Sequence, residues 1–210
     1  MPAASVQVLP DGCVDLIWDG DRLFVAGPDP VAAEAVLAPG AQLVGVRLAP
    51  GAARGLLGLP LHEITGQRVA MDELWGRSAI ALQCELQRAA KPVEVLLAAI
   101  ARRPSAPDPR MAHLFARLAG ADAPRIAALA RELGSSERDL RRRCQDHFGY
   151  GAKTLDRILR LQRWLACTRR SRTLTDAALA AGYADAAHLV HDARQLTGLA
   201  PGDLARRHAD

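Results

Sequence analysis

The sequence has few of the features that mark secreted, membrane-bound, metal-binding or enzymatic proteins. No apolar run approaches the roughly 20 residues of a membrane-spanning helix, and the N-terminus lacks the basic start and apolar core of a signal peptide. Four scattered cysteines form no CxxC pair, and there is no phosphate-binding glycine loop, HExxH or GxSxG motif. We therefore expect a cytoplasmic protein that is not an enzyme, does not associate with a membrane, and binds neither a cofactor nor a metal.

Charge divides the chain into two unequal halves. Residues 1–110 carry 10 Lys and Arg against 12 Asp and Glu, whereas residues 111–210 carry 17 against 11. Only Lys91 and Lys153 are lysine, and we attribute the abundance of arginine mainly to a GC-rich genome. The uneven distribution of charge, rather than the number of arginines, predicts that residues 111–210 bind the phosphates of nucleic acid.

The first half predicts an α+β domain over residues 1–103. Short β-forming runs separated by turn residues cover 6–9, 14–18, 23–25 and 42–48. After Pro50 the pattern becomes helical, and we expect helices over 52–57, 71–75, 79–89 and 92–102. Three prolines within residues 104–109 predict a linker over residues 104–110, which leaves residues 111–210 as an all-α domain.

Two helix-turn-helix patterns in tandem are the most informative feature of the second half. Each pattern combines two amphipathic helices, over residues 125–134 and 135–148 in the first and over 174–183 and 185–198 in the second. Ser136 and Asp185 are expected to cap the second helix of each pair. A long helix from about Thr154 to Arg170 joins the patterns. One pattern alone would fit any small helical bundle, but two at a fixed separation favour DNA binding.

The second helix of such a pair lies in the major groove, where its first turns contact base edges. Counting outward from the buried Leu140 and Leu189 gives nine predicted base contacts: Ser136, Arg138, Arg141, Arg142, Gln145, Ala187, His188, Val190 and His191. Arginine fits guanine and glutamine fits adenine, and each bidentate pair contributes ~1–3 kcal/mol of discrimination. In the second helix only the histidines can hydrogen-bond, so we expect the first unit to supply most of the specificity.

The long helix sets the distance between the two units. About 17 residues at ~1.5 Å per residue span roughly 26 Å, which lets the two recognition helices reach successive major grooves ~34 Å apart. Four arginines are predicted to contact phosphates and to make the affinity salt-dependent: Arg125, Arg131, Arg157 and Arg160.

Residues 111–207 resemble the AraC/XylS family of bacterial transcription regulators. The match includes Phe148-Gly149 and Ala181-Gly182-Tyr183, and it is most specific from Asp185 to Leu189 and from Thr197 to Pro201. The resemblance implies a seven-helix domain that binds double-stranded DNA, a neighbouring sensor or dimerisation domain, and an action on transcription, usually activation, that involves RNA polymerase. The chain departs from the family pattern at six positions: Ala152, Trp164, Leu189, Val190, His191 and Ala193.

The N-terminal half is similar to a poorly characterised sensor type that is fused to such domains. The similarity rests on residues 9–17, 45–51 and 74–76 and implies no known ligand. Members of that type begin roughly 30 residues earlier, so a missing strand would leave an open sheet edge and favour a homodimer.

A small-molecule effector of this sensor would have Cys13, Trp18, Arg47 and Trp75 as candidate pocket residues. The alternative is that Cys13 is a small buried hydrophobe and that both tryptophans belong to the core. Two other functions stay open on the sequence alone. One is a DNA-repair alkyl transferase that uses Cys13 or Cys84 as acceptor, and the other is an architectural protein whose DNA affinity depends on salt but hardly on sequence.

Overall fold

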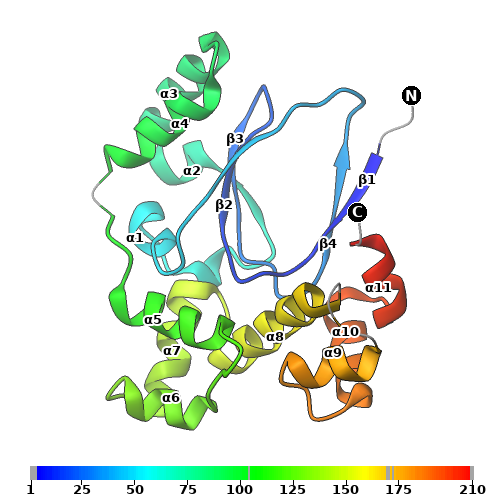
Figure 1. Ribbon diagram of the computed structural model, residues 1–210. Helices are drawn as coiled ribbons and strands as arrows, with labels where there is room; N and C mark the ends of the chain where they lie inside the picture. Colours follow the sequence, from blue (N-terminus) through cyan, green and yellow to red (C-terminus); the bar gives the residue numbers. More distant parts are fainter. Residues whose placement is uncertain (1–3, 104, 169–170, 172, 209–210) are drawn as a thin grey trace.

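The computed structural model describes residues 4–103, 105–168, 171 and 173–208. Its buried apolar side chains form two cores, one drawn from Val14 to Ala99 and the other from Met111 to Leu204. We call the parts around them the N-terminal lobe (residues 4–103) and the C-terminal lobe (residues 105–208). Figure 1 shows the strands of the N-terminal lobe above the helices of the C-terminal lobe. Among the described residues, no helix has both the length and the apolar character needed to span a bilayer.

The strands of the N-terminal lobe form two separate antiparallel sheets. They are β1 (Ala4–Val8), β2 (Asp15–Trp18), β3 (Leu23–Ala26), β4 (Ala33–Leu37), β5 (Val44–Arg47) and β6 (Arg68–Ala70). The larger sheet has the order β5-β2-β3-β6, while β1 pairs only with β4. Leu16, Trp18, Leu23 and Val25 are buried on one face of the larger sheet, because residues two apart in a strand share a face.

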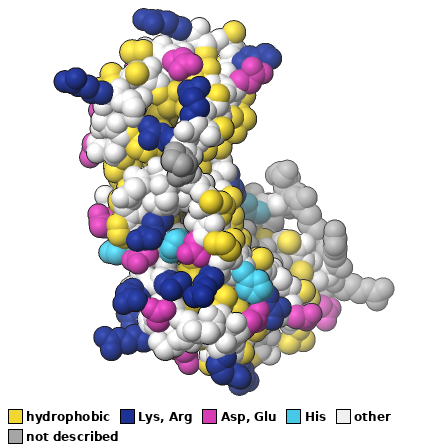
Figure 2. Space-filling view, turned by 90° about the vertical axis from the view of Figure 1, so that its left-hand side faces the viewer, with side chains coloured by type: hydrophobic (Ala, Val, Ile, Leu, Met, Phe, Trp, Pro, Cys, Tyr) yellow, Lys and Arg dark blue, Asp and Glu magenta, His cyan; other side chains and the backbone are white. Residues whose placement is uncertain are grey.

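Five helical segments follow β5 along the chain, and their apolar residues share one core with the buried face of the larger sheet. They are α1 (Ala53–Leu57), the short 3₁₀ helix η1 (Leu61–Glu63), α2 (Met71–Trp75), α3 (Arg77–Arg88) and α4 (Pro92–Ala101). Leu56 of α1, Leu82 of α3 and Leu96 of α4 are buried in this core. The outer side of α3 and α4 stays partly apolar, since Ile80, Val93 and Leu97 are exposed, and Figure 2 shows hydrophobic atoms gathered on this upper part of the molecule.

The C-terminal lobe contains, in the described residues, the seven helices that the resemblance implies. They are α5 (Pro109–Ala119), α6 (Ile126–Glu132), α7 (Glu137–Phe148), α8 (Ala152–Thr168), α9 (Leu174–Ala180), α10 (Ala186–Thr197) and α11 (Pro201–Arg207). The long helix α8 runs through the centre and buries Leu155, Ile158, Leu161 and Trp164. Trp164, at a departure from the family pattern, is a fully buried part of this core.

The predicted linker over residues 104–110 overlaps the start of α5, which begins at Pro109. Pro104 lies outside the described residues, while Pro109 and Arg110 form the first turn of α5. The Asp108 carboxylate caps this turn by accepting from the backbone N–H groups of Arg110 (2.9 Å) and Met111 (3.1 Å). Because the Asp108 N–H also donates to the Gly51 carbonyl (3.2 Å), the end of the segment is tied to the N-terminal lobe.

The structure confirms an α+β part followed by an all-α part with two helix-turn-helix units joined by a long helix. Its α8 begins two residues before the predicted long helix, and Arg170 at the predicted end lies outside the described residues. Strands β4 and β6 were not predicted. The first is mostly small or exposed residues and the second has only three residues, so neither shows a clear alternating pattern.

Candidate DNA interface

The first helix-turn-helix unit consists of α6, a turn at Gly134 and the recognition helix α7. Leu129, Leu140 and Cys144 fill the space between the two helices and are fully buried. Gly134 has φ +60°, in the region that favours glycine. The Ser136 hydroxyl accepts from the Asp139 backbone N–H (3.1 Å), so the predicted cap of α7 is present.

The first turns of α7 present an exposed basic surface. Ser136, Arg138, Arg141 and Arg142 are exposed, whereas Gln145 is half-buried nearer the C-terminal end. A hollow of about 240 Å³ lies at the start of the helix and is lined by Ser136, Arg138, Asp139 and Arg142. This surface has both the open space and the hydrogen-bond donors that contact with a base edge requires.

Asp139 organises the charges beside this hollow. Its carboxylate accepts from the hydroxyl of Ser135 (2.8 Å) and from the guanidinium groups of Arg142 (2.6 Å) and Arg143 (3.2 Å). The Ser135 hydrogen bond and the two arginines lower the pKa of Asp139 below its ordinary value. The Arg142 side chain is still 74% exposed. Because an exposed ion pair contributes little free energy, Arg142 can leave Asp139 and contact a base instead.

The second unit repeats the same local design with different residues. The Thr173 hydroxyl caps α9 by accepting from the Asp176 N–H (3.1 Å), and the Asp185 carboxylate caps α10 by accepting from the His188 N–H (2.7 Å). Glycines with positive φ stand in the turn between the helices, at Gly182, and after α10, at Gly198. The Asp185 cap and the Gly198 ending are as predicted.

The exposed side of α10 has fewer donors than that of α7. Ala187 and His191 are exposed, while His188 and Val190 are half-buried. The His188 ring meets the Tyr183 ring edge-on, with 5.1 Å between the ring centroids. The predicted difference in hydrogen-bonding capacity between the two recognition helices is therefore visible in the exposed side chains.

The four arginines assigned to phosphates divide into two pairs. Arg125 and Arg131 are exposed near the two ends of α6, and neither has an ion-pair partner among the described residues. Arg157 and Arg160 instead lie between α8 and α10. Arg157 Nε donates to Asp192 Oδ1 (2.9 Å), and Arg160 is paired with Asp156 and is only 16% exposed. The structure thus gives Arg157 and Arg160 partners within the lobe rather than a free surface.

Sequence reasoning missed Asp192, the one buried carboxylate among the described residues. It could have been found, because Asp192 falls on the inward stripe of α10 between Leu189 and Leu196, where a charge needs a partner. Arg163, also on α8, donates to the carbonyls of Leu118 and Ala181 within the lobe.

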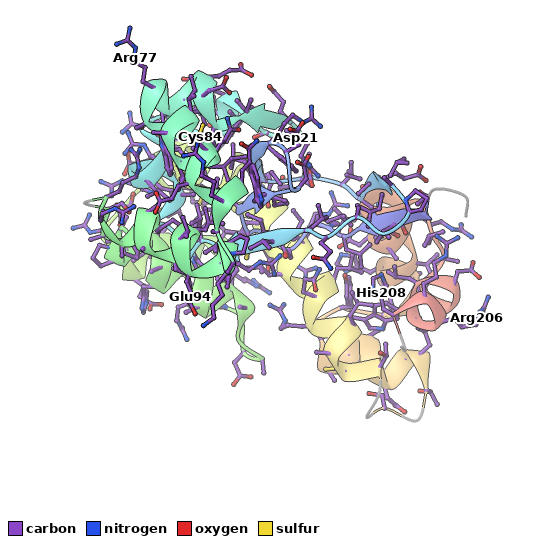
Figure 3. All side chains as sticks on the ribbon, turned by 90° about the horizontal axis from the view of Figure 1, so that it is seen from above. Asp21, Arg77, Cys84, Glu94, Arg206 and His208 are labelled. Carbon is purple, nitrogen blue, oxygen red and sulfur yellow. The ribbon has the colours of Figure 1, made fainter. Side chains whose placement is uncertain are left out.

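The N-terminal lobe touches the C-terminal ends of both recognition helices. At the end of α7, Thr65 Oγ1 lies 3.1 Å from the Gly149 carbonyl, sharing its single proton with the Leu61 carbonyl at the same distance. At the end of α10, Gln7 Nε2 donates to the Thr197 carbonyl (3.0 Å) and the Ala32 N–H donates to the Leu196 carbonyl (2.6 Å). Figure 1 and Figure 3 show the β1–β4 pair beside α10 and α11, apart from the larger sheet. No pattern in the sequence pointed to these contacts.

The four candidate effector residues do not surround one common space. Cys13 and Arg47 are neighbours near Asp11 and Asp15, and Arg47 donates to both Asp15 oxygens (3.0 Å each). Trp18 is a buried core residue, and Trp75 lies under the Arg103 guanidinium, 3.5 Å from its ring centroid. A separate hollow of about 300 Å³ between α3 and α4 is lined by Ser78, Ala81, Leu82, Glu85, Ala99, Arg102 and Arg103.

Two of the cysteines lie where burial disfavours the thiolate. Burial raises the pKa of the Cys13 thiol to about 12, and the negative charge of Asp11 adds to this effect. Cys144 is buried in the core of the first unit, and burial raises its pKa to about 12 as well. Among the described residues, no three His, Cys, Asp or Glu side chains are grouped so that they could hold a metal ion.

Comparison with known proteins matches each lobe to a family model. Residues 129–207 match a family described as a helix-turn-helix domain, and residues 2–70 match a domain of unknown function (DUF6597). The structure of ToxT from Vibrio cholerae O395 is similar, with a TM-score of 0.51, 9% identity, and coverage of 97% of this chain and 93% of that one. Another ToxT structure from Vibrio cholerae has a TM-score of 0.49, 11% identity, and coverage of 96% and 88%. No curated protein matches the sequence significantly.

Proposed function

We propose that the chain is a DNA-binding transcription regulator of the AraC type and that α7 and α10 enter successive major grooves of one operator. The match of residues 129–207 to a helix-turn-helix domain supports this proposal. The observation that carries this proposal is the pair of capped, partly exposed recognition helices joined by α8. The 17 residues of α8 span roughly 26 Å. With the side offsets of the two units, this length suits grooves ~34 Å apart.

We assign base reading mainly to the first unit. Arg138, Arg141 and Arg142 would contact guanine, and Gln145 would contact adenine, with Ser136 beside them at the helix start. In α10, His188 and His191 would hydrogen-bond to base edges, while Ala187 and Val190 would make apolar contact with a thymine methyl group. Arg125 and Arg131 would contact phosphates and set the register of the protein on the duplex.

The N-terminal lobe would act on DNA binding through its contacts with the recognition helices. This lobe contacts both units: Thr65 bonds at the end of α7, and Gln7 and Ala32 bond at the end of α10. A small-molecule effector, or a homodimer formed through an open sheet edge, would change these contacts as well as the short segment before α5. Recruitment of RNA polymerase would then follow in the cytoplasm, at the bound operator.

A catalytic role finds little support in the cysteines. An alkyl acceptor needs a thiolate, and burial in the structure disfavours the thiolates of Cys13 and Cys144. Cys84 is exposed, but it lies on α3, at the opposite end of the molecule from α7 and α10 in Figure 1. We therefore propose that the chain is not an enzyme. Alkyl transfer that is lost on Cys13→Ser or Cys84→Ser would reverse this assignment.

Selection of random duplex DNA by the purified full chain, at near-physiological salt and followed by sequencing, tests the proposed function. We expect a motif with one strong element and one weaker element about one helical turn away. Arg142→Ala should relax a single base position in the strong element. Binding that is retained with no enriched motif, and with a steep salt dependence, would instead indicate an architectural protein.

A further inference from the structure

A buried group of charges connects the second recognition helix to α8. Asp192 has a side chain only 3% exposed, and its Oδ1 accepts from Arg157 at 2.8 Å (Nη2) and 2.9 Å (Nε). Arg157 Nη2 also donates to Gln195 Oε1 (2.7 Å), one turn further along α10. Since a buried carboxylate is strongly unfavourable without a partner, this pair fixes how α10 is rotated against α8.

His188, one turn before Asp192, faces the same group of charges. Its Nε2 lies 3.3 Å from Arg160 Nη1 and 3.7 Å from Asp192 Oδ2. The guanidinium of Arg160 is itself held by Asp156 and lies over the Tyr183 ring, 5.4 Å from its centroid. The ring of His188 therefore lies beside Arg160 of α8, Asp192 of α10 and Tyr183 of the turn between α9 and α10.

Arg160 and Asp192, the two neighbours of Nε2, favour different tautomers of the neutral His188 ring. A guanidinium can only donate, so a hydrogen bond from Arg160 requires Nε2 to accept and places the proton of the neutral ring on Nδ1. A carboxylate can only accept, so a hydrogen bond to Asp192 would require the proton on Nε2. Only the contact with Arg160 lies within hydrogen-bond distance. Arg157 balances the charge of Asp192 through Oδ1, while Oδ2 is buried without a hydrogen-bond partner in the described part of the chain and lies 3.7 Å from Nε2.

We propose that Arg160, supported by the Asp192–Arg157 pair, is a positioning residue that holds His188 with its proton on Nδ1 and so sets which base edge the second recognition helix can read. This inference deepens the proposed function and rests on it. Nδ1 has no hydrogen-bond partner among the described residues, and the His188 side chain is 38% exposed. The ring is therefore free to donate from Nδ1 on the side away from Arg160.

A fixed donor at this position has a defined preference in the major groove. It can bond to N7 or O6 of guanine, N7 of adenine or O4 of thymine, but it cannot bond to the N4 amino group of cytosine. The base that faces His188 should therefore be any base except cytosine. The same side chain with its proton on Nε2 would present an acceptor at Nδ1, which could bond to the N4 amino group of cytosine or the N6 amino group of adenine but not to guanine or thymine.

The tautomer of His188 can be measured without DNA by ¹⁵N NMR of the histidine rings in the free full-length chain. His188→Gln identifies the His188 signals by their loss. We expect the Nδ1–H tautomer to dominate in the wild type and the Nε2–H tautomer to dominate in Arg160→Met, which removes the donor and keeps an apolar stem. A wild-type ring with its proton on Nε2, or a tautomer unchanged by Arg160→Met, would overturn the proposal.

Binding to the selected operator and to its single-base variants tests the consequence for specificity. His188→Ala identifies the base pair that His188 faces. In the wild type we expect cytosine at that position to weaken binding by about five- to tenfold, and in Arg160→Met we expect this penalty to vanish while the first element keeps its penalties.

Arg206→Met is the matched control, because Arg206 forms an exposed pair with Asp203 on α11 and points away from the body of the molecule in Figure 3. It should leave the penalties at both elements unchanged. An equal loss of affinity for all sequences in Arg160→Met would mean that Arg160 contacts a phosphate and would refute its positioning role. If no operator is found at all, the proposed function fails, while the tautomer measurement still decides the arrangement of the ring.

Discussion

The two helix-turn-helix units share their backbone design but differ in where their charges lie. In the first unit the charges of α7 are exposed, and Asp139 pairs with arginines that remain open to solvent. In the second unit the principal acidic residue, Asp192, is buried and pairs with α8. Both units therefore share their caps and glycine turns, whereas their charged side chains point to solvent in the first unit and toward α8 in the second.

On the proposed function, this difference would give the two units separate parts in one binding event. The first unit has several donors on its exposed first turns, which suits base discrimination. The second unit has few donors, yet it is fastened to α8 by Arg157 and to the N-terminal lobe by Gln7 and Ala32. A firmly placed second unit can fix the distance between the two contacts with DNA even when it reads few bases.

The largest effect on stability is expected from Asp192→Ala. Removal of one partner leaves the charge of Arg157 poorly compensated between α8 and α10, and breaking a buried pair costs about 3–5 kcal/mol. Asp139→Ala, the exposed counterpart in the first unit, should lower the free energy of unfolding much less. Urea denaturation of the two variants measures the difference. Equal losses would show that the buried and exposed pairs are not energetically distinct.

The next largest effect is expected from Gly149→Ala at the end of α7. Gly149 has φ +82°, and an added Cβ would lie 2.4 Å from Thr65 Oγ1 and 2.5 Å from Pro28 Cγ. Strain and overlap together should cost about 2–4 kcal/mol. Gly198→Ala at the end of α10 is the matched control, since φ is +74° and the Cβ would meet nothing within 4 Å. It should cost about 1–2 kcal/mol.

Thermal unfolding of the two glycine variants tests whether the N-terminal lobe packs against the first unit in solution. A similar loss of stability in both would mean that the Cβ of residue 149 finds room, so that the contact between η1, Pro28 and α7 is looser than the structure shows.

A smaller change, confined to DNA binding, is expected from Arg142→Ala. The variant should lose ~1–3 kcal/mol on the selected operator and relax one base position in the strong element. Its free energy of unfolding should change by no more than about 0.5 kcal/mol, because Arg142 is on the surface. His191→Ala in the second unit should weaken operator binding less. Fluorescence anisotropy with labelled operator compares the two, and a larger loss for His191→Ala would reverse the ranking of the units.

Much of the fold could be predicted because its causes are local. The caps at Ser136 and Asp185, the glycine turns and the apolar stripes of α7 and α8 depend on residues three or four positions apart. The contacts of Gln7 with Thr197 and of Thr65 with Gly149 join residues 190 and 84 positions apart. No periodic pattern encodes such contacts, so they could not be predicted.

The candidate DNA interface was predictable in part for the same reason. Exposed positions on α7 follow from counting around Leu140, and Arg138, Arg141 and Arg142 are exposed as expected. Arg157 and Arg160 were taken for surface arginines, because helical periodicity alone does not tell which polar side of α8 faces α10. The acidic partner in the inward stripe of α10 was the signal that could have corrected this assignment.

The smallest difference is expected between the two helix caps. Ser136→Ala removes one hydrogen bond to a backbone N–H of α7 and should cost about 1 kcal/mol. Asp185→Ala removes an equivalent bond in α10 and also a negative charge at the helix N-terminus, which adds about 0.3–1 kcal/mol. Asp185→Ser, which keeps a cap without the charge, should recover the hydrogen-bond part alone. If urea denaturation gives Asp185→Ala and Asp185→Ser equal losses, the α10 cap acts through its charge rather than through its hydrogen bond.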